Sequence, residues 1–343
     1  MEALQKGGRF DLRLIHTGQH FDDNMSKVFF EQLRIPQPDE YLDIHEGGPA
    51  EQIGRVMLAL ESEFRQNPPE IVVVFGDVNS TMAAAVTANK LNLNLAHVEA
   101  GLRSFDLSMP EEHNRIVADL LSDFLFTPSR DADENLLKAG IPEDRIYFVG
   151  NIMVDSMLRF KPMAEKLQAW ETYGLQPGSY GLVTLHRPSN VDKFAELGEI
   201  VDALIEIQKE VPLLFPVHPR SRKQLEQNGL LERLEKGKIQ ILEPLGYLEF
   251  LSLMTKAKVV LTDSGGIQEE TTVLGVPCLT VRSNTERPIT ITMGTNQLVG
   301  SKKEKIMAGL REIEKHGGKA RLPELWDGKS SLRIEKILTD KLG

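Results

Sequence analysis

The sequence has few of the features that mark secreted or membrane-bound proteins. Its 343 residues include one cysteine, Cys278, which excludes an intramolecular disulfide and favours a reducing cytoplasm. No apolar run approaches the roughly eighteen residues that a membrane-spanning helix needs. The amino terminus also has no signal-peptide pattern. The sequence therefore predicts a cytoplasmic protein without a membrane partner.

Several motifs that identify cofactor, metal or serine-hydrolase sites are also missing. The chain has no six-position dinucleotide fingerprint, no P-loop and no GxSxG elbow, and its Cys and His residues lack structural-zinc spacing. We therefore expect no cofactor and no metal. The formal net charge of −10 argues against nucleic acid as a partner. Phosphate binding would have to rely on local backbone amides and a few placed basic groups.

The residues that are present alternate between strand and helix patterns, which predicts an α/β fold with parallel sheets. Because the length exceeds that of a usual single domain and the pattern breaks at Pro177 and Gly178, we expect two Rossmann-like domains, 1–176 and 177–343. Strands are predicted over 10–16, 41–44, 71–75, 93–98, 124–126, 146–149, 180–185, 213–217, 239–242, 259–262 and 277–281. Helices are predicted near 24–33, 53–64, 80–91, 110–115, 136–139, 194–211, 247–256, 264–274, 303–316 and 330–342.

Three carboxylates in the first half are candidates for chemistry. Asp77 and Glu99 each come just after a predicted buried strand, and Glu111 lies in the first turn of a helix that Pro110 opens. Because the carboxyl ends of parallel strands meet at one edge of a sheet, we expect these side chains to gather there, where they suit general acid and base work. The structural alternative is that Asp77 caps a helix and that the acidic first turn complements the helix dipole.

The stretch TDSGGIQEE is the sharpest signal in the second half. A strand ends there and a helix begins, so the backbone amides of Ser264, Gly265 and Gly266 are predicted to form an anion site suited to a diphosphate. Glu270, less than two turns further along, is placed to reach ribose hydroxyls. The alternative for Glu270 is a solvent-exposed helix residue.

Other polar residues in the second half follow strands in the same way. TLHRPSN puts His186 and Arg187 at a strand end, and VHPR puts His218 at the next one. A single histidine is more often structural than catalytic, but a histidine at a strand end beside an arginine is a better candidate than most. Arg287 in NTERP suits a phosphate fork, with a surface pair to Glu286 as the alternative.

Together these motifs resemble the non-hydrolysing UDP-N-acetylglucosamine 2-epimerases. TGQH, GDVNST, HVEAGLR, MPEEHNR, TLHRPSN, TDSGGIQEE and NTERP occur in the family's order across nearly the whole chain. The resemblance implies a GT-B-like fold, in which two Rossmann-like domains with parallel sheets enclose a central cleft for the nucleotide sugar. It also implies a homodimer. We further expect the last helix to pack back on the N-terminal domain.

By the same resemblance, the protein is an isomerase that interconverts UDP-GlcNAc and UDP-ManNAc without NAD, supplying surface-polysaccharide precursors. The C2 proton is removed as UDP leaves C1, and UDP then re-adds with a proton delivered to the other face of C2. The enzymatic alternatives are an epimerase of a UDP-2,3-diacetamido uronic acid and a hydrolysing epimerase that releases ManNAc and UDP. An inactive nucleotide-sugar binder is a third alternative, and a GT-B glycosyltransferase is a fourth on fold alone.

The resemblance also implies residue roles. Asp77, Glu99 and Glu111 would be the catalytic carboxylates, with His186 near the diphosphate and sugar. Which carboxylate is the base and which the acid stays open. The UDP-sugar would contact Arg115, Arg187, Leu245, Phe250, Ser264, Gly265, Gly266, Glu270 and Arg287.

Three departures from the family's pattern bear on activity. The chain begins after the family's first strand and its GTRPE-type loop, which predicts two strands with an unpaired edge and low stability or inactivity. HRPSN stands where many members have HRREN or HRAEN. Gln19, His20 and His218 are candidate residues for an allosteric second UDP-GlcNAc, but Phe21 and Asp22 replace the usual polar pair and argue against activation.

Overall fold

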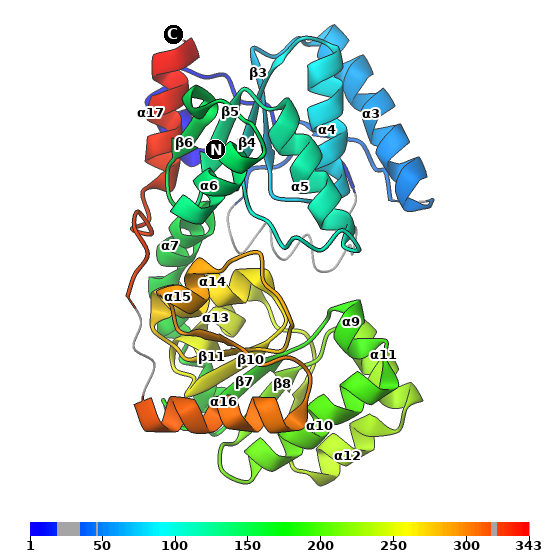
Figure 1. The fold of residues 1–343 in the computed structure, drawn as a ribbon, viewed down its shortest axis with the longest axis vertical. Helices are drawn as coiled ribbons and strands as arrows, with labels where there is room; N and C mark the ends of the chain where they lie inside the picture. The colour runs from blue at the N-terminus through cyan, green and yellow to red at the C-terminus, as the bar shows by residue number, and fades with distance from the viewer. Residues whose placement is uncertain (19–34, 46, 317–320, 343) are drawn as a thin grey trace. The chain divides into compact units, whose positions relative to one another are not determined.

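The computed structural model describes residues 1–18, 35–45, 47–316 and 321–342 (Figure 1). The chain divides into two compact units. Unit 1 comprises Met1–Asp155 and Glu324–Gly343, and unit 2 comprises Ser156–Pro323. No helix in the described ranges is long and apolar enough to cross a membrane.

The division between the units lies earlier in the chain than the predicted boundary at 176/177. The segment before Pro177 is held in unit 2, because the Ala169 amide donates to Ser252 Oγ at 3.1 Å and the Tyr173 hydroxyl donates to Glu249 Oε1 at 2.8 Å. These bonds join α8 (Ala169–Thr172) and the residues after it to α13 (Tyr247–Thr255). The proline–glycine break is therefore a turn inside unit 2.

Unit 1 contains a parallel sheet in the order β3-β4-β5-β6. Side chains on β3 alternate between its faces, and Val72 and Val74 pack with Leu95 against the buried stripes of α3 and α4. The strands are β3 (Ile71–Phe75), β4 (Asn94–Val98), β5 (Phe124–Thr127) and β6 (Ile146–Phe148). Helices and a turn along this part of the chain are α1 (Glu2–Gly7), α3 (Pro49–Gln66), α4 (Asn79–Lys90), α5 (Pro110–Leu121), α6 (Arg130–Lys138), the 3-10 turn η1 (Glu143–Arg145) and α7 (Ile152–Leu167).

The opposite face of this sheet is covered by the last helix, α17 (Ser330–Leu342). Ile334 and Leu338 of α17 are buried with Val98, Phe126 and Val149, and α17 lies beside β6 in Figure 1. The Trp326 indole N–H, just before the helix, donates to the Pro128 carbonyl at 2.9 Å. The carboxyl-terminal residues are therefore part of the core of unit 1.

Two short strands of unit 1, β1 (Ile15–His16) and β2 (Glu40–Tyr41), form a parallel pair of their own. The predicted strand 10–16 is shortened because the Leu14 amide donates at 2.7 Å to the Asp39 side chain instead of a strand carbonyl. Within the described residues, β1 pairs only with β2 and β3 only with β4. Each therefore has one edge without a strand partner. The predicted helix 24–33 lies outside the described residues.

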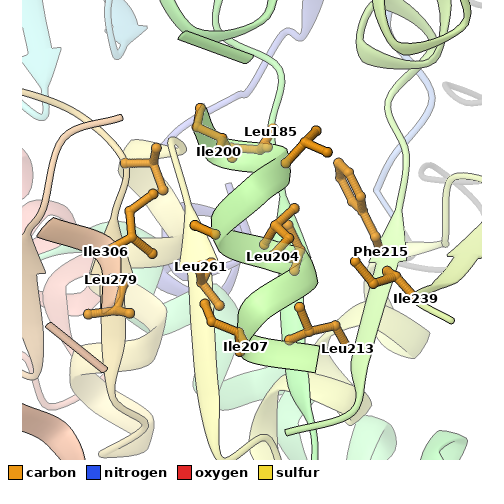
Figure 2. Close-up of a cluster of buried hydrophobic side chains, with 14 of the residues drawn as sticks. Leu185, Ile200, Leu204, Ile207, Leu213, Phe215, Ile239, Leu261, Leu279 and Ile306 are labelled. Carbon is orange, nitrogen blue, oxygen red and sulfur yellow. The ribbon is translucent and has the colours of Figure 1, made fainter. Parts of the chain in front are cut away.

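Unit 2 contains a parallel sheet in the order β12-β11-β10-β7-β8-β9. Its main core lies under α10, where Leu204 and Ile207 meet Phe215 and Leu261 (Figure 2). In Figure 1, α10 and α16 lie on one side of these strands, and α13 and α14 lie on the other. The strands are β7 (Gly181–Thr184), β8 (Leu213–Pro216), β9 (Gln240–Leu242), β10 (Val259–Thr262), β11 (Cys278–Thr280) and β12 (Asn296–Leu298). The remaining helices are α9 (Pro188–Val191), α10 (Phe194–Gln208), α11 (Pro219–Gln227), α12 (Leu230–Lys236), α14 (Gly265–Leu274), α15 (Ile289–Thr292) and α16 (Lys303–His316).

Candidate active site

In unit 1, the carboxyl ends of β3 and β4 bring two of the predicted carboxylates to one edge. The Gly76 amide donates to the Val98 carbonyl at 3.1 Å, so Asp77 and Glu99 each lie one residue beyond this bonded pair. Helix α5 begins beside the same edge, because Asn114 Nδ2 donates to the Asp77 carbonyl at 2.8 Å. The first turn of α5 carries Glu111, whose side chain is exposed.

Arg115 is buried beneath this edge. Its Nε donates to Asp77 Oδ2 at 3.0 Å, and its Nη1 donates to Glu112 Oε2 at 2.7 Å. Arg115 is 2% exposed, whereas the Asp77 side chain keeps 30% of its surface exposed. We expected Arg115 to contact the substrate. The structure shows that Arg115 holds the carboxylate of Asp77 in place, and its contact with the substrate stays a prediction.

The neighbouring glutamates Glu111 and Glu112 have different environments. Glu112 is 1% exposed and accepts bonds from the Ser104 amide and hydroxyl, both at 2.9 Å, and from the Phe105 amide at 3.0 Å. Burial opposes ionisation of Glu112, but these hydrogen bonds and Arg115 hold its pKa below the ordinary value. Glu112 therefore anchors the loop before α5, and Glu111 is the residue of the pair that reaches solvent.

Glu99 has a strained backbone. Its φ is 72°, in the left-handed region that non-glycine residues rarely adopt. Such a residue costs about 1–3 kcal/mol and persists only where its surroundings enforce it, commonly at functional sites. The conformation turns the chain sharply at the end of β4.

In unit 2, Asp263 organises the loop that follows β7. Asp263 is 0% exposed and accepts hydrogen bonds from the backbone amides of His186 at 3.1 Å and Arg187 at 3.0 Å, and from Asn190 Nδ2 at 3.0 Å. His186 Nδ1 lies 2.9 Å from Asp263 Oδ1. Although burial opposes ionisation, His186 and these donors keep the pKa of Asp263 below its ordinary value. His186 Nδ1 therefore carries a proton toward Asp263, and its side chain remains 41% exposed.

The TDSGG turn differs from the predicted anion site at one residue. The Ser264 amide donates to Thr262 Oγ1 at 2.9 Å, so this amide is already engaged inside the protein, contrary to prediction. Helix α14 begins at Gly265, and first-turn amides have no acceptor within their own helix. The amides of Gly265 and Gly266 and the positive end of the helix dipole therefore remain suited to a phosphate.

Arg287 is buried beside this turn. Its Nε lies 2.7 Å from Glu269 Oε1, and its Nη1 lies 2.7 Å from Glu286 Oε1. Arg287 is therefore paired to Glu286, as the structural alternative predicted. The predicted surface position is wrong, because Arg287 is 9% exposed. Burial alone would raise the pKa of Glu286, but Arg287 and Arg282 hold it well below its usual range.

Arg187 joins the same ion cluster. Its Nε donates to the Asp263 carbonyl at 3.0 Å, and its Nη2 lies 3.4 Å from Glu286 Oε1. Arg282 Nη2 donates to Glu286 Oε2 at 2.8 Å. Arg187 and Arg287 are thus both oriented by carboxylates next to the first turn of α14.

Glu270 is buried, so the alternative prediction of a solvent-exposed helix residue is wrong. It is 7% exposed, and its Oε1 accepts a hydrogen bond from the Tyr247 hydroxyl at 2.9 Å. Burial, with Glu269 adding repulsion, raises the pKa of Glu270 to about 7. Tyr247 lies on α13, which also carries the half-buried Phe250; Leu245, also half-buried, lies in the loop before this helix.

The candidate allosteric residues are only partly described. Gln19 and His20 lie outside the described residues. His218 lies beside His186, with ring centroids 6.0 Å apart, and its Nδ1 accepts the Arg220 amide at 3.2 Å. Burial, together with the charges of His186 and Arg220, lowers the pKa of His218. The structure thus places His218 among the candidate site residues of unit 2.

Sequence reasoning missed the groups that orient these residues. Asp263 and Tyr247 were not assigned roles, although Asp263 stands at a strand end in TDSGG. Asp119 and His97 also form a buried pair in unit 1. In the described residues, no group of three or more His, Cys, Asp or Glu side chains is placed to hold a metal ion.

Comparison with known proteins identifies the family to which the chain is similar. The family described as UDP-N-acetylglucosamine 2-epimerase matches residues 2–339. The UDP-N-acetylglucosamine 2-epimerase of Methanocaldococcus jannaschii is 44% identical over 345 residues, covering 99% of this chain and 94% of that protein. The UDP-2,3-diacetamido-2,3-dideoxy-D-glucuronate 2-epimerase of Pseudomonas aeruginosa is 45% identical over 301 residues, covering 87% and 82%.

The fold is similar as well. The crystal structure of the M. jannaschii enzyme in complex with UDP-GlcNAc and UDP matches with a TM-score of 0.91 at 43% identity, covering 99% of this chain and 94% of that chain. Two Rossmann-like units with parallel sheets confirm the predicted GT-B-like fold class. With seven motifs in order and a match along nearly its whole length, the chain belongs to the UDP-N-acetylglucosamine 2-epimerase family.

Proposed function

We propose that the protein is an isomerase that interconverts UDP-GlcNAc and UDP-ManNAc by eliminating UDP and adding it back. The observation that carries this proposal is the arrangement at the carboxyl edge of the unit 1 sheet. Asp77 and the strained Glu99 follow the paired strands β3 and β4, and helix α5, whose first turn carries Glu111, is bonded to the same edge. Family membership along residues 2–339 supports it.

In this proposal, the carboxylates Asp77, Glu99 and Glu111 handle the C2 proton. As a carboxylate takes this proton, the C2–H electron pair forms a C1=C2 double bond and the C1–O bond breaks with its electrons going to UDP. In the return step, a UDP oxygen attacks C1 and a proton adds to the other face of C2. Positioned acid and base groups typically contribute about 10²–10⁴-fold to such proton transfers.

The residues of unit 2 suit the nucleotide part of a UDP-sugar. The amides of Gly265 and Gly266, with Arg187, suit the diphosphate, whose negative charge grows as C1–O breaks. His186, with Nδ1 held by Asp263, directs its other ring nitrogen to the leaving group. Glu270 is assigned to the ribose hydroxyls, and Leu245 and Phe250 to the uracil. The Ser264 hydroxyl and Arg287 complete the proposed set, Arg287 by orienting the turn.

The sugar has a second candidate, the UDP-2,3-diacetamido uronic acid. It is favoured by the P. aeruginosa relative, which is 45% identical over 301 residues, against 44% over 345 residues for the M. jannaschii enzyme. The two substrates differ in their substituents at C3 and C6, so an enzyme should turn over one faster than the other. Supplying both together measures the ratio of their kcat/KM values. The preferred substrate is the one with the higher kcat/KM.

The reaction is tested by incubating the protein with UDP-GlcNAc in D₂O and following proton NMR. Deuterium entering C2 with the nucleotide sugar intact supports epimerisation. Release of free ManNAc would indicate the hydrolysing reaction, and UDP binding without C2 exchange would indicate a nucleotide-sugar binder. Asp77→Asn, Glu99→Gln and Glu111→Gln should each lower exchange at least about 10²-fold. Glu61→Gln, which removes an exposed glutamate paired with Arg65 on α3, is the matched control.

We also propose that the protein is a cytoplasmic homodimer acting in surface-polysaccharide synthesis, as the resemblance implies. Exposed apolar side chains on and before α5 support an interface there, with Phe105 77%, Leu107 63% and Leu120 62% exposed. Such a grouping is typical of interaction surfaces. Leu120→Glu should therefore convert a dimer to a monomer in sedimentation analysis. A wild-type protein that sediments as a monomer would contradict the proposal.

A further inference from the structure

A buried histidine lies under the carboxylates of unit 1. His97 is on β4 between Leu95 and Val98, and its side chain is 0% exposed. Its Nε2 lies 2.9 Å from the Gly76 carbonyl, and its Nδ1 lies 2.6 Å from Asp119 Oδ1 on α5. A polar ring in the middle of a buried strand is costly unless its bonds are made, so both contacts are required for this packing.

The two contacts determine the protonation of the ring. A carbonyl oxygen can only accept, so His97 Nε2 must carry a hydrogen. Asp119 accepts the Gly101 amide at 3.1 Å and pairs with Arg103 Nη1 at 2.6 Å, as an ionised carboxylate does. Nδ1 therefore also donates, and His97 is an imidazolium.

The pair contacts every segment that carries a proposed catalytic carboxylate. Gly76, whose carbonyl accepts from His97, directly precedes Asp77. Gly101, whose amide donates to Asp119, closes the turn in which Glu99 adopts its left-handed conformation. Asp119 itself is on α5, two turns after Glu111.

We propose that His97 and Asp119 form a positioning pair that holds the Asp77 loop, the Glu99 turn and helix α5 in catalytic register. This inference rests on the proposed epimerase function and adds two residues to it that do not touch the substrate. Loss of either partner leaves the other charge buried and lets the two loops move independently.

Charges around the ring act in the same direction. Burial disfavours the imidazolium, but Asp119, the Gly76 carbonyl and Glu99 raise the pKa of His97 above its ordinary value. Arg103 faces Asp119 from the loop after β4 and balances its charge.

The test compares His97→Gln and Asp119→Asn with wild type in the C2 exchange assay. Misplacement of catalytic groups by about 1 Å costs on the order of 10²-fold in rate, so we expect kcat to fall about 10- to 100-fold. KM for UDP-GlcNAc should change less than about threefold, because the UDP-binding residues of unit 2 are untouched. Rates are normalised to the concentration of protein that binds UDP.

Asp155→Asn is the control for loss of a partly buried anion in unit 1. Asp155 accepts the Ser330 and Ser331 amides at 3.0 and 2.8 Å and so holds the start of α17 rather than the Asp77 loop or the Glu99 turn. This variant should lower the thermal midpoint and leave kcat unchanged. If His97→Gln and Asp119→Asn likewise lose only stability and keep kcat, the positioning role is wrong. If wild type shows no exchange, the proposed function fails instead.

A measurement on the wild-type protein covers the case in which the variants do not fold. In protein labelled with ¹⁵N-histidine, one ring should keep two protonated nitrogens to a higher pH than exposed histidine rings do, because the contacts of His97 raise its pKa. Eight histidines give a tractable spectrum. If no ring keeps its second proton beyond the pH at which the exposed rings lose theirs, His97 is not a buried imidazolium and the proposal is overturned.

Discussion

Glu270 illustrates how one buried residue links stability to function. Its carboxyl is enclosed, receives one hydrogen bond from Tyr247 and stands beside Glu269. A pKa of about 7 means that Glu270 binds its proton more tightly in the folded protein than in the unfolded chain. The stability that Glu270 contributes is therefore present at acidic pH and is lost as pH rises through about 7.

We predict that Glu270→Gln stabilises unit 2 in a pH-dependent way. The amide keeps an acceptor for Tyr247 and removes the cost of ionising a buried carboxyl. A pKa raised from 4.5 to about 7 corresponds to about 3 kcal/mol, so the advantage should be small near pH 4.5 and approach that value by pH 8. Calorimetric unfolding at the two pH values measures it.

Glu226→Gln, which removes an exposed carboxyl of unit 2, controls for the loss of one charge. An advantage of Glu270→Gln that is equal at both pH values would contradict the raised pKa.

At the scale of elements, the first turn of α14 depends on the absence of a side chain at its first residue. A Cβ added to Gly265 would lie 2.5 Å from Arg287 Nη1 and 2.8 Å from Glu286 Oε1. Both atoms belong to the buried ion cluster, so moving them away would break buried ion pairs. At Gly266, by contrast, an added Cβ meets nothing within 4 Å.

We therefore predict that Gly265→Ala destabilises unit 2 by about 1–3 kcal/mol, the usual range for overpacking. The same change should weaken UDP binding, because it displaces Arg287 from the turn. Gly266→Ala should be neutral or stabilise by up to about 1 kcal/mol, since alanine restricts the unfolded chain and fits a helix. Urea unfolding and UDP titration measure both. Equal losses of stability in the two variants would contradict the steric argument.

The elements also show how far sequence patterns reach. Strand β3 and helix α17 have the predicted bounds, because their apolar periodicity is strong and turn signals flank them. The shortened β1 was not predictable, since it depends on the Asp39 side chain from a distant segment. The division between the units differs from the predicted boundary because Pro177 and Gly178 form a turn inside a domain as readily as a linker between domains.

The candidate site shows the same limit. Strand ends indicated Asp77, Glu99 and His186, because topology alone brings strand ends together. The burial of Arg115 and Arg287 could not be read from their motifs, since it depends on partners at Asp77, Glu112 and Glu269. A charged residue inside an apolar pattern, such as His97, is the signal that sequence reasoning should have followed.

At the scale of the whole molecule, the two units have separate cores, and mutations should act on one unit at a time. Leu338 of α17 and Leu204 of α10 are each 1% exposed, in the cores of unit 1 and unit 2 respectively. We predict that Leu338→Ala and Leu204→Ala each cost about 2–5 kcal/mol in their own unit.

Hydrogen exchange measured by mass spectrometry distinguishes the two outcomes. Leu338→Ala should speed exchange in β4 and β5 and leave β7 and β8 unchanged, and Leu204→Ala should do the reverse. Faster exchange throughout the chain in both variants would show that the units unfold together.

The return of residues 324–343 to unit 1 has a consequence for biosynthesis. A ribosome must translate all of unit 2 before Trp326 and α17 emerge, so the face of β4 and β5 that α17 covers lacks this cover until residues 324–343 have been made. Unit 2 is continuous and can complete first. Nascent chains arrested before residue 324 should therefore present apolar strand surface to chaperones, and full-length chains should not.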